Sequence, residues 1–236
     1  MANLSMRSIR YDWHHGGPVV TQAIIAICMA AWLLEVVLRY LSPSLYASVV
    51  GGGLYAPYLA VAHPWSWLTS LFLHAQNPMH VGFNMLTLWM VGPTLERMMG
   101  HWSYLGLYLI SGLGGAAGLS LWAWARADWS VSAYGASGAL FGLFAALLVV
   151  YRRMGVELRS MLIWMAINFA MPLVIPNVAW QAHAGGFVVG GLLTVLLVSR
   201  MPGLQHASMR ARMWTYGGAM VVVLAAVIVL CAKFAM

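Results

Sequence analysis

Apolar residues run through the chain in long stretches that short polar segments separate. Seven of these stretches are close to the ~20 residues that an α-helix needs to cross a lipid bilayer. They cover residues 19–40, 80–99, 102–124, 136–151, 158–175, 181–199 and 214–233. The pattern therefore predicts an all-α polytopic membrane protein with seven transmembrane helices.

The segment between the first two predicted helices differs from an ordinary water-exposed loop. Residues 40–95 contain no Asp, Glu, Lys or Arg. The segment instead carries aromatic side chains of the kind that settle at the lipid–water boundary, namely Tyr46, Tyr55, Tyr58, Trp65 and Trp67. We predict that residues 41–79 form a partly helical hairpin embedded in the outer leaflet, where protein or water covers any non-helical backbone.

Composition supports a membrane protein and argues against several other classes. Of the 236 residues, 62% are hydrophobic and 7% are charged, whereas about a quarter of a typical soluble domain is charged. The net charge of +7 comes without a basic run, so we expect no nucleic-acid partner. Cys28 and Cys231 both fall inside predicted helices, so we expect no disulfide and no CxxC metal site. The first helix has no A-x-A cleavage site, and we interpret it as a retained helix rather than a signal peptide.

The distribution of Arg and Lys predicts the orientation in the membrane. If the N-terminus is cytoplasmic, nine basic residues lie on the cytoplasmic side: Arg7, Arg10, Arg97, Arg152, Arg153, Arg159, Arg200, Arg210 and Arg212. Three lie on the other side, namely Arg39, Arg126 and Lys233. Because basic residues concentrate in cytoplasmic loops, the C-terminus is expected outside. This pattern, together with the lack of a targeting presequence, favours a bacterial inner membrane.

Polar residues within the predicted helices cluster at one depth. Ser137, His183 and the pair His80 and Asn84 each lie in the first turn or so of a helix that runs from outside to inside. Polar groups inside a membrane are costly and are usually functional or hold helices together. Glycines accompany the fourth and sixth helices, where they allow close backbone approach. We therefore expect these two helices to touch and to bring Ser137 close to His183.

Such a cluster is suited to acyl transfer. A serine is a weak nucleophile that needs an adjacent base, most often histidine. The side chains of His80 and Asn84 and the backbone N–H of Ser137 are donors for a developing oxyanion. No acid is placed convincingly beside His183, so we predict a Ser–His dyad rather than a triad.

Other interpretations of the same residues stay open. A Gly-x-Ser-Gly at a helix start often serves packing, and His80 with Asn84 can simply hold helices together. The agreement of four residues in depth favours catalysis. A metal site built on His74, His80 and His183 is not expected, because neither an acid nor a cysteine joins them. We expect no cofactor.

The motifs together resemble the rhomboid intramembrane serine proteases, over about residues 63–191. Gly135-Ala-Ser137-Gly138 is similar to the family's G-x-S-G motif. The stretch from Ala182-His183 through Gly186 and Gly190 is similar to its A-H-x-x-G-x-x-x-G helix, and His80-Val-Gly-Phe-Asn84 to its H-x-x-x-N motif. Trp67 to His74 resembles the stretch leading into that helix, and Gly92 to Gly100, with Glu96 and Arg97, the turn that closes it.

The resemblance implies roles for individual residues. Ser137 would be the nucleophile, His183 the general base, and His80, Asn84 and the Ser137 backbone the oxyanion hole. Supporting and packing residues would be Gly135, Gly138, Phe141, Gly186 and Gly190. The fifth helix with loop 171–180 would be a lateral gate and cap. The sequence departs from many members at Ser66, where they have Arg, and at Phe141, where they have Tyr.

The resemblance also implies a domain order and a substrate class. A short cytoplasmic segment (1–18) would precede a six-helix catalytic core (19–199), in which 41–79 is the membrane-embedded first loop. A cytoplasmic linker (200–213) and an additional C-terminal transmembrane helix (214–236) would follow. The substrates would be membrane proteins cut in or near their transmembrane segments. Two alternatives are an inactive rhomboid-like binding or escort factor and a small transporter, although a transporter would place charges or broken helices at the midplane.

Overall fold

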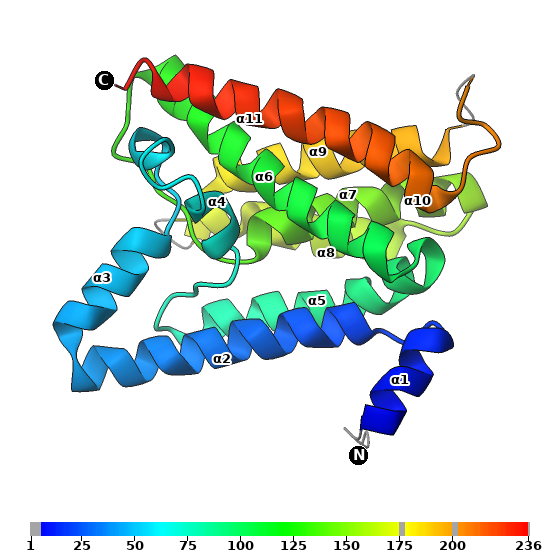
Figure 1. Ribbon diagram of the computed structural model, residues 1–236, viewed down its shortest axis with the longest axis horizontal. Coiled ribbons are helices and arrows are strands. Elements are labelled where there is room, and N and C mark those ends of the chain that lie inside the picture. The colour runs from blue at the N-terminus through cyan, green and yellow to red at the C-terminus, as the bar shows by residue number, and fades with distance from the viewer. Residues whose placement is uncertain (1–5, 175–177, 200–202, 236) are drawn as a thin grey trace.

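The computed structural model describes residues 6–174, 178–199 and 203–235, and this part of the chain is built from helices (Figure 1). The long helices are α2 (Val19–Leu41), α5 (Pro78–Met99), α6 (His101–Arg126), α7 (Ser137–Met154), α8 (Arg159–Val174) and α9 (Trp180–Val198). A last continuous helix comprises α10 (Met209–Arg212), a π-helical turn (Met213–Gly217) and α11 (Gly218–Ala232). A short helix, α1 (Met6–His14), precedes them. Within the described residues, each of the seven predicted stretches forms a helix, and the last helix begins at Met209, before the predicted boundary at 214.

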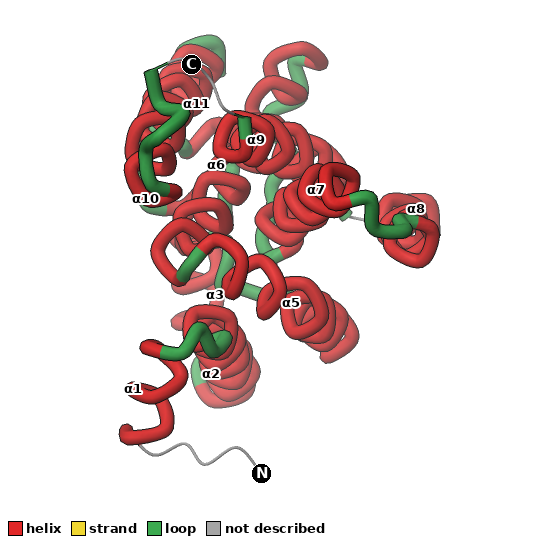
Figure 2. Tube along the Cα trace, turned by 90° about the vertical axis from the view of Figure 1, so that its right-hand side faces the viewer, coloured by secondary structure: helices red, strands yellow, loops and turns green. Residues whose placement is uncertain are grey.

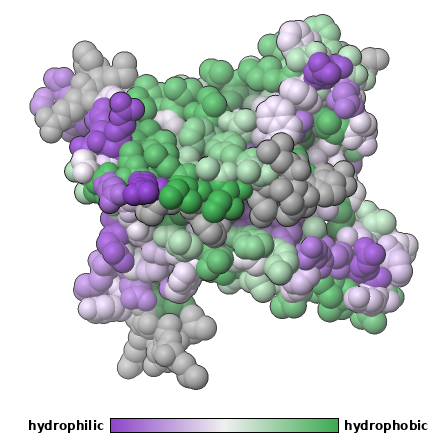
Figure 3. Space-filling model, turned by 180° about the vertical axis from the view of Figure 1, so that it is seen from behind, coloured by the Kyte–Doolittle hydropathy of each residue, from purple (hydrophilic) through white to green (hydrophobic). Residues whose placement is uncertain are grey.

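Within the described residues, five helices are long and apolar enough to cross a membrane. They are α2, α6, α7, α9 and the continuous helix Met209–Ala232. Helix α5 is not among them, and α8 has 16 residues, fewer than the ~20 of a typical span. Hydrophobic residues cover the middle of the surface in Figure 3, and hydrophilic residues gather toward its left and right ends. The chain is therefore an all-α integral membrane protein, as the sequence predicts.

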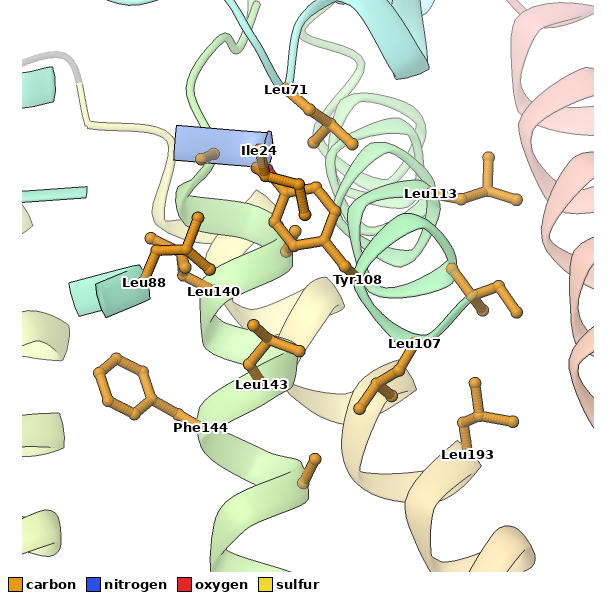
Figure 4. Close-up of a cluster of buried hydrophobic side chains, with 14 of the residues drawn as sticks. Ile24, Leu71, Leu88, Leu107, Tyr108, Leu113, Leu140, Leu143, Phe144 and Leu193 are labelled. Carbon is orange, nitrogen blue, oxygen red and sulfur yellow. The ribbon is translucent and has the colours of Figure 1, made fainter. Parts of the chain in front are cut away.

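Helices α6, α7 and α9 pack on one another at the centre of the fold. Helix α11 lies against α6, α2 pairs with α5, and α8 lies on the outside beyond α7 (Figures 1 and 2). The buried core between the central helices includes Leu107 and Tyr108 of α6, Leu143 and Phe144 of α7, and Leu193 of α9 (Figure 4).

Glycines bring the central backbones into contact, which confirms the prediction that the fourth and sixth predicted helices touch. A Cβ added to Gly190 of α9 would lie 2.5 Å from the Cα of Gly142 on α7. A Cβ on Gly186 would lie 2.8 Å from the carbonyl carbon of Gly138. Because real Cβ atoms do not come this close to backbone, only glycine permits this separation of α7 and α9.

The predicted partly helical hairpin 41–79 contains α3 (Pro43–Gly53), a 3-10 turn (Pro57–Leu59) and the short helix α4 (Ser66–Thr69). Its non-helical backbone is bonded to the loop that precedes α7. Tyr55 and Ala133 exchange two backbone hydrogen bonds, and the N–H of Gly135 donates to the carbonyl of Ser70. The hairpin thus braces the start of α7.

A buried carboxylate near the C-terminal end of α5 binds the N-terminal end of α2, which is the end away from the hairpin. Glu96 of α5 accepts hydrogen bonds from the backbone N–H groups of Val20 and Thr21 at 2.8 Å and from the Thr21 hydroxyl at 2.7 Å. It also lies 2.6 Å from Nδ1 of His101, whose Nε2 lies 2.9 Å from the carbonyl of Trp13. One side chain therefore satisfies two of the N-terminal N–H groups of α2, which have no partner inside the helix.

Candidate active site

Ser137 is the first residue of α7, and the backbone before it is specialised. Gly135 has φ +123°, a conformation that favours glycine, and a Cβ there would lie 2.9 Å from Nε2 of His80. The chain therefore turns tightly against His80 and then enters α7. The Ser137 N–H consequently belongs to the positive end of the helix dipole, where N–H groups have no partner inside the helix.

His183 approaches Ser137 from the first turns of α9. Its Nε2 lies 2.8 Å from the Ser137 Oγ. The imidazole is stacked on the ring of Phe141, with centroids 4.3 Å apart and planes inclined by 14°. His183 is 6% exposed, and its Nδ1 has no hydrogen-bond partner among the residues that the structure describes. Within the described residues, the arrangement is a serine and histidine pair without a carboxylate bonded to the histidine.

His80 and Asn84 come from the first two turns of α5 and line the same cavity as Ser137 and His183. The N–H of Ala75 donates to Nδ1 of His80 at 3.0 Å. A neutral imidazole carries one proton, so the His80 proton lies on Nε2, the atom beside Gly135. The Asn84 amide donates to the carbonyl of His80 at 2.9 Å. The four polar residues singled out in the sequence are thus assembled at one end of α5, α7 and α9.

The cavity has a volume of about 320 Å³. Apolar groups such as Phe83, Ala116, Leu140 and Phe144 line it beside the polar cluster. A few convergent polar groups in a largely apolar cavity are typical of a binding site. No group of three or more His, Cys, Asp or Glu suited to a metal ion occurs within the described ranges.

Tyr55 joins the hairpin to α6 at the edge of this cavity. Its hydroxyl lies 2.6 Å from the Ser120 Oγ, and its side chain is buried. Burial raises the pKa of Tyr55 to about 12, although the hydrogen bond to Ser120 lowers it in part. The phenol therefore stays neutral and holds the hairpin without adding charge to the site.

Some predicted features lie elsewhere. Ser66, which stands where many rhomboids have Arg, is buried in α4. The predicted gate and cap at 171–180 includes residues 175–177, which lie outside the described residues. Glu35 of α2 is one of the acids that the sequence does not place beside His183, and in the structure this buried carboxylate accepts a hydrogen bond from the N–H of His74, within the hairpin. The available signal was its occurrence in a transmembrane helix.

The family model of the Rhomboid domain matches residues 61–200. The chain belongs to the rhomboid family. RHOMBOID-like protein 1 of Arabidopsis thaliana is 39% identical over 143 residues, which are 58% of this chain and 35% of that protein. Rhomboid protease GluP of Bacillus subtilis (strain 168) is 30% identical over 187 residues, or 75% of this chain and 34% of that protein.

The Putative rhomboid protease YdcA of Bacillus subtilis (strain 168) is similar along most of both chains. It is 32% identical over 188 residues, which are 78% of this rhomboid chain and 90% of that protein. By contrast, the chain spans about a third of the length of the first curated relatives that it matches.

Proposed function

We propose that this rhomboid-family chain is an intramembrane serine endopeptidase that uses Ser137 and His183 as a catalytic dyad. The observation that carries the proposal is the 2.8 Å separation between the Ser137 Oγ and the His183 Nε2. This distance is within the ordinary range of a hydrogen bond, so the imidazole can take the hydroxyl proton as the oxygen attacks. The names of relatives such as Rhomboid protease GluP support the same activity.

In the acylation step, the Ser137 Oγ bonds to the carbonyl carbon of the substrate peptide while its proton passes to His183 Nε2. The carbonyl oxygen becomes an oxyanion, and we assign its stabilisation to the His80 Nε2–H, to an N–H of the Asn84 amide and to the Ser137 N–H. His183 then gives the proton to the leaving amine as the C–N bond breaks. A water molecule, deprotonated by the same imidazole, hydrolyses the acyl-enzyme and releases Ser137.

Two features bear on how His183 would work without an acid, namely the ring of Phe141 and an Nδ1 that has no hydrogen-bond partner among the described residues. Stacking on Phe141 restrains the ring plane. With no carboxylate beside it in the described part of the chain, the imidazole relies on this restraint for its orientation. The dyad is therefore expected to be slower than a triad, in which the acid orients and stabilises the histidine.

The proposed substrates are membrane proteins with a transmembrane segment next to the site. A helical segment must unwind before a serine can reach its backbone, because its carbonyl groups are already paired. Substrates with Gly or Pro near the cleaved bond should therefore be preferred. We propose an active site on the outer side of a bacterial inner membrane, with a cytoplasmic N-terminus and an outer C-terminus. The excess of basic residues on one side of the predicted spans supports this orientation.

We propose the same domain order as the sequence suggests, a six-helix core at 19–199 and an additional helix at 214–236. The packing of α11 against α6 supports the view that the last helix buttresses the core.

The decisive experiment is cleavage of a single-span test substrate in liposomes by the wild type, Ser137→Ala and His183→Ala. Ser130→Ala, a change at an exposed serine just before α7, is the matched control. We expect cleavage by the wild type and the control, and none by the two dyad variants. Equal cleavage by Ser137→Ala would refute the proposed nucleophile. Folded wild-type protein that binds but never cleaves several substrates would favour the alternative of an inactive binding or escort factor.

A further inference from the structure

A carboxylate in α2 is buried although burial of such a group is energetically unfavourable, and the proposed reaction gives it no role. Glu35 is 2% exposed and lies in a helix suited to cross the membrane. Its Oε1 accepts a hydrogen bond of 3.2 Å from the N–H of His74, and its Oε2 has no partner in the part of the chain that the structure describes. Ionisable groups inside membrane proteins are expensive and usually serve function. Glu35 belongs neither to the dyad nor to the oxyanion donors.

A second polar contact from the same helix reaches the next residue of the hairpin. Trp32 precedes Glu35 by three positions, so both side chains leave the same face of α2. The Trp32 indole N–H donates to the carbonyl of Ala75 at 3.0 Å. The two side chains therefore hold the dipeptide His74-Ala75 from both ends, at the N–H of the first residue and the C=O of the second.

The group held between these two contacts is the N–H of Ala75, which donates to Nδ1 of His80 at 3.0 Å. This bond is possible only when Nδ1 carries no proton, so it leaves the proton on Nε2. Nε2 is the atom that lies against Gly135, beside Ser137. In the opposite tautomer a lone pair would face the developing oxyanion and would repel it.

We propose that Trp32 and Glu35 are positioning residues for catalysis, which act through His74-Ala75 to fix the tautomer and orientation of His80. This inference rests on the proposed function, because it assigns His80 an oxyanion contact. Helix α2 thereby participates in the active site although it contributes no side chain to the cavity lining. Neither residue touches the substrate, so their removal should lower kcat and leave KM nearly unchanged.

The test compares variants that remove one hydrogen bond each with matched controls. Glu35→Leu removes the acceptor for the His74 N–H, whereas Glu35→Gln keeps an oxygen there. Trp32→Phe keeps an aromatic ring and removes the donor to Ala75. The controls are Glu157→Leu and Trp102→Phe, at exposed positions. Cleavage of the single-span substrate in liposomes gives kcat and KM, and thermal unfolding checks each fold.

We expect Glu35→Leu and Trp32→Phe to lower kcat by roughly 10-fold to 100-fold, below the ~10²–10³-fold loss for removing one oxyanion donor outright. Glu35→Gln should restore kcat to within roughly threefold of wild type, because the lost bond returns. In a His80→Ala background the two changes should cause no further loss, since residues that act through one group are not additive.

Nitrogen NMR of histidine-labelled protein supplies a readout that does not depend on activity. The His80 signal, assigned by its loss in His80→Ala, should report a protonated Nε2 in the wild type and a mixture of tautomers in Trp32→Phe. An unchanged tautomer in that variant, a rise in KM with constant kcat, or full additivity with His80→Ala would overturn the inference.

The outcomes separate this inference from the proposed function. If Glu35→Leu does not fold, Trp32→Phe and Glu35→Gln decide it. If the folded wild type never cleaves, the proposed function fails, and the inferred role in catalysis fails with it. The tautomer measurement then still tests whether α2 fixes the imidazole. If the wild type cleaves and Trp32→Phe matches it in rate, the inference alone fails.

Discussion

The closest backbone contact between α7 and α9 offers a quantitative test of how packing sets the proposed dyad. Replacing Gly186 by Ala adds a Cβ that would lie 2.8 Å from the carbonyl carbon of Gly138, and closer still to its oxygen. Ordinary van der Waals contact begins at 3.4 Å. The carbonyl carbon alone requires a separation of 3.4 − 2.8, or about 0.6 Å, and the nearer carbonyl oxygen requires more, so about 0.6 Å is the smallest displacement that relieves the contact. The carbonyl oxygen of Ser111 on α6, 3.2 Å from the same Cβ, resists movement toward that side.

This displacement acts on the hydrogen bond between the two helices, because Ser137 and Gly138 are neighbours and His183 lies one turn before Gly186. If the movement is transmitted in full, the distance from Ser137 Oγ to His183 Nε2 grows from 2.8 Å to at least about 3.4 Å, outside the usual range of hydrogen bonds. A misplacement of ~1 Å costs up to about 100-fold in rate. We expect Gly186→Ala to lower kcat by roughly 10-fold to 100-fold and to destabilise the fold by about 1–3 kcal/mol.

The assay measures kcat on the single-span substrate, the rate of labelling by a fluorophosphonate, and the midpoint of thermal unfolding. Gly218→Ala is the control, because it also replaces a helical glycine, with no neighbouring atom within 4 Å of the new Cβ. The control should keep both its rate and its stability. A Gly186→Ala variant with kcat within twofold of the wild type would refute the argument that the glycine contact sets the dyad geometry.

Three further changes test other parts of the site. Phe141→Leu should lower kcat about 2-fold to 10-fold, because the stacked ring on His183 contributes ~0.5–1.5 kcal/mol. Phe141→Tyr keeps the ring and should stay near wild type. Equal rates for the wild type, Phe141→Leu and Phe141→Tyr would contradict this role of the ring. Gly135→Ala should lower kcat by roughly 10²–10³-fold without unfolding the protein, since the new Cβ displaces His80; an active variant would show that this donor is dispensable. Glu96→Ala should lower the free energy of unfolding, measured by heat or denaturant, by about 3–5 kcal/mol, because it leaves several buried polar groups without a hydrogen-bond partner. An unchanged unfolding midpoint would disprove that role of Glu96.

The long helices, and the position of each polar residue along its helix, could be predicted from the amino-acid sequence alone. Both follow from local rules, because lipid requires each spanning segment to be apolar for about 20 residues and to satisfy its own backbone. Ser137, His80 and His183 stand out because each occurs in the first turns of a largely apolar helix. The contact between α7 and α9 could be predicted in the same way. Glycine is unfavourable inside an isolated helix, so its occurrence at Gly138, Gly142, Gly186 and Gly190 indicates close packing between two helices.

Which polar groups meet across long separations in the chain depends on three-dimensional packing and could not be predicted from the sequence. Glu35 contacts His74, 39 positions away, and Trp32 contacts Ala75, 43 positions away. No periodicity links such pairs, because their encounter depends on how α2 docks beside α5 and the hairpin. The tautomer of His80 follows from the same docking, since a backbone N–H from the hairpin occupies its Nδ1. Local sequence thus supplied the reactive groups, and long-range packing determined their orientation and protonation.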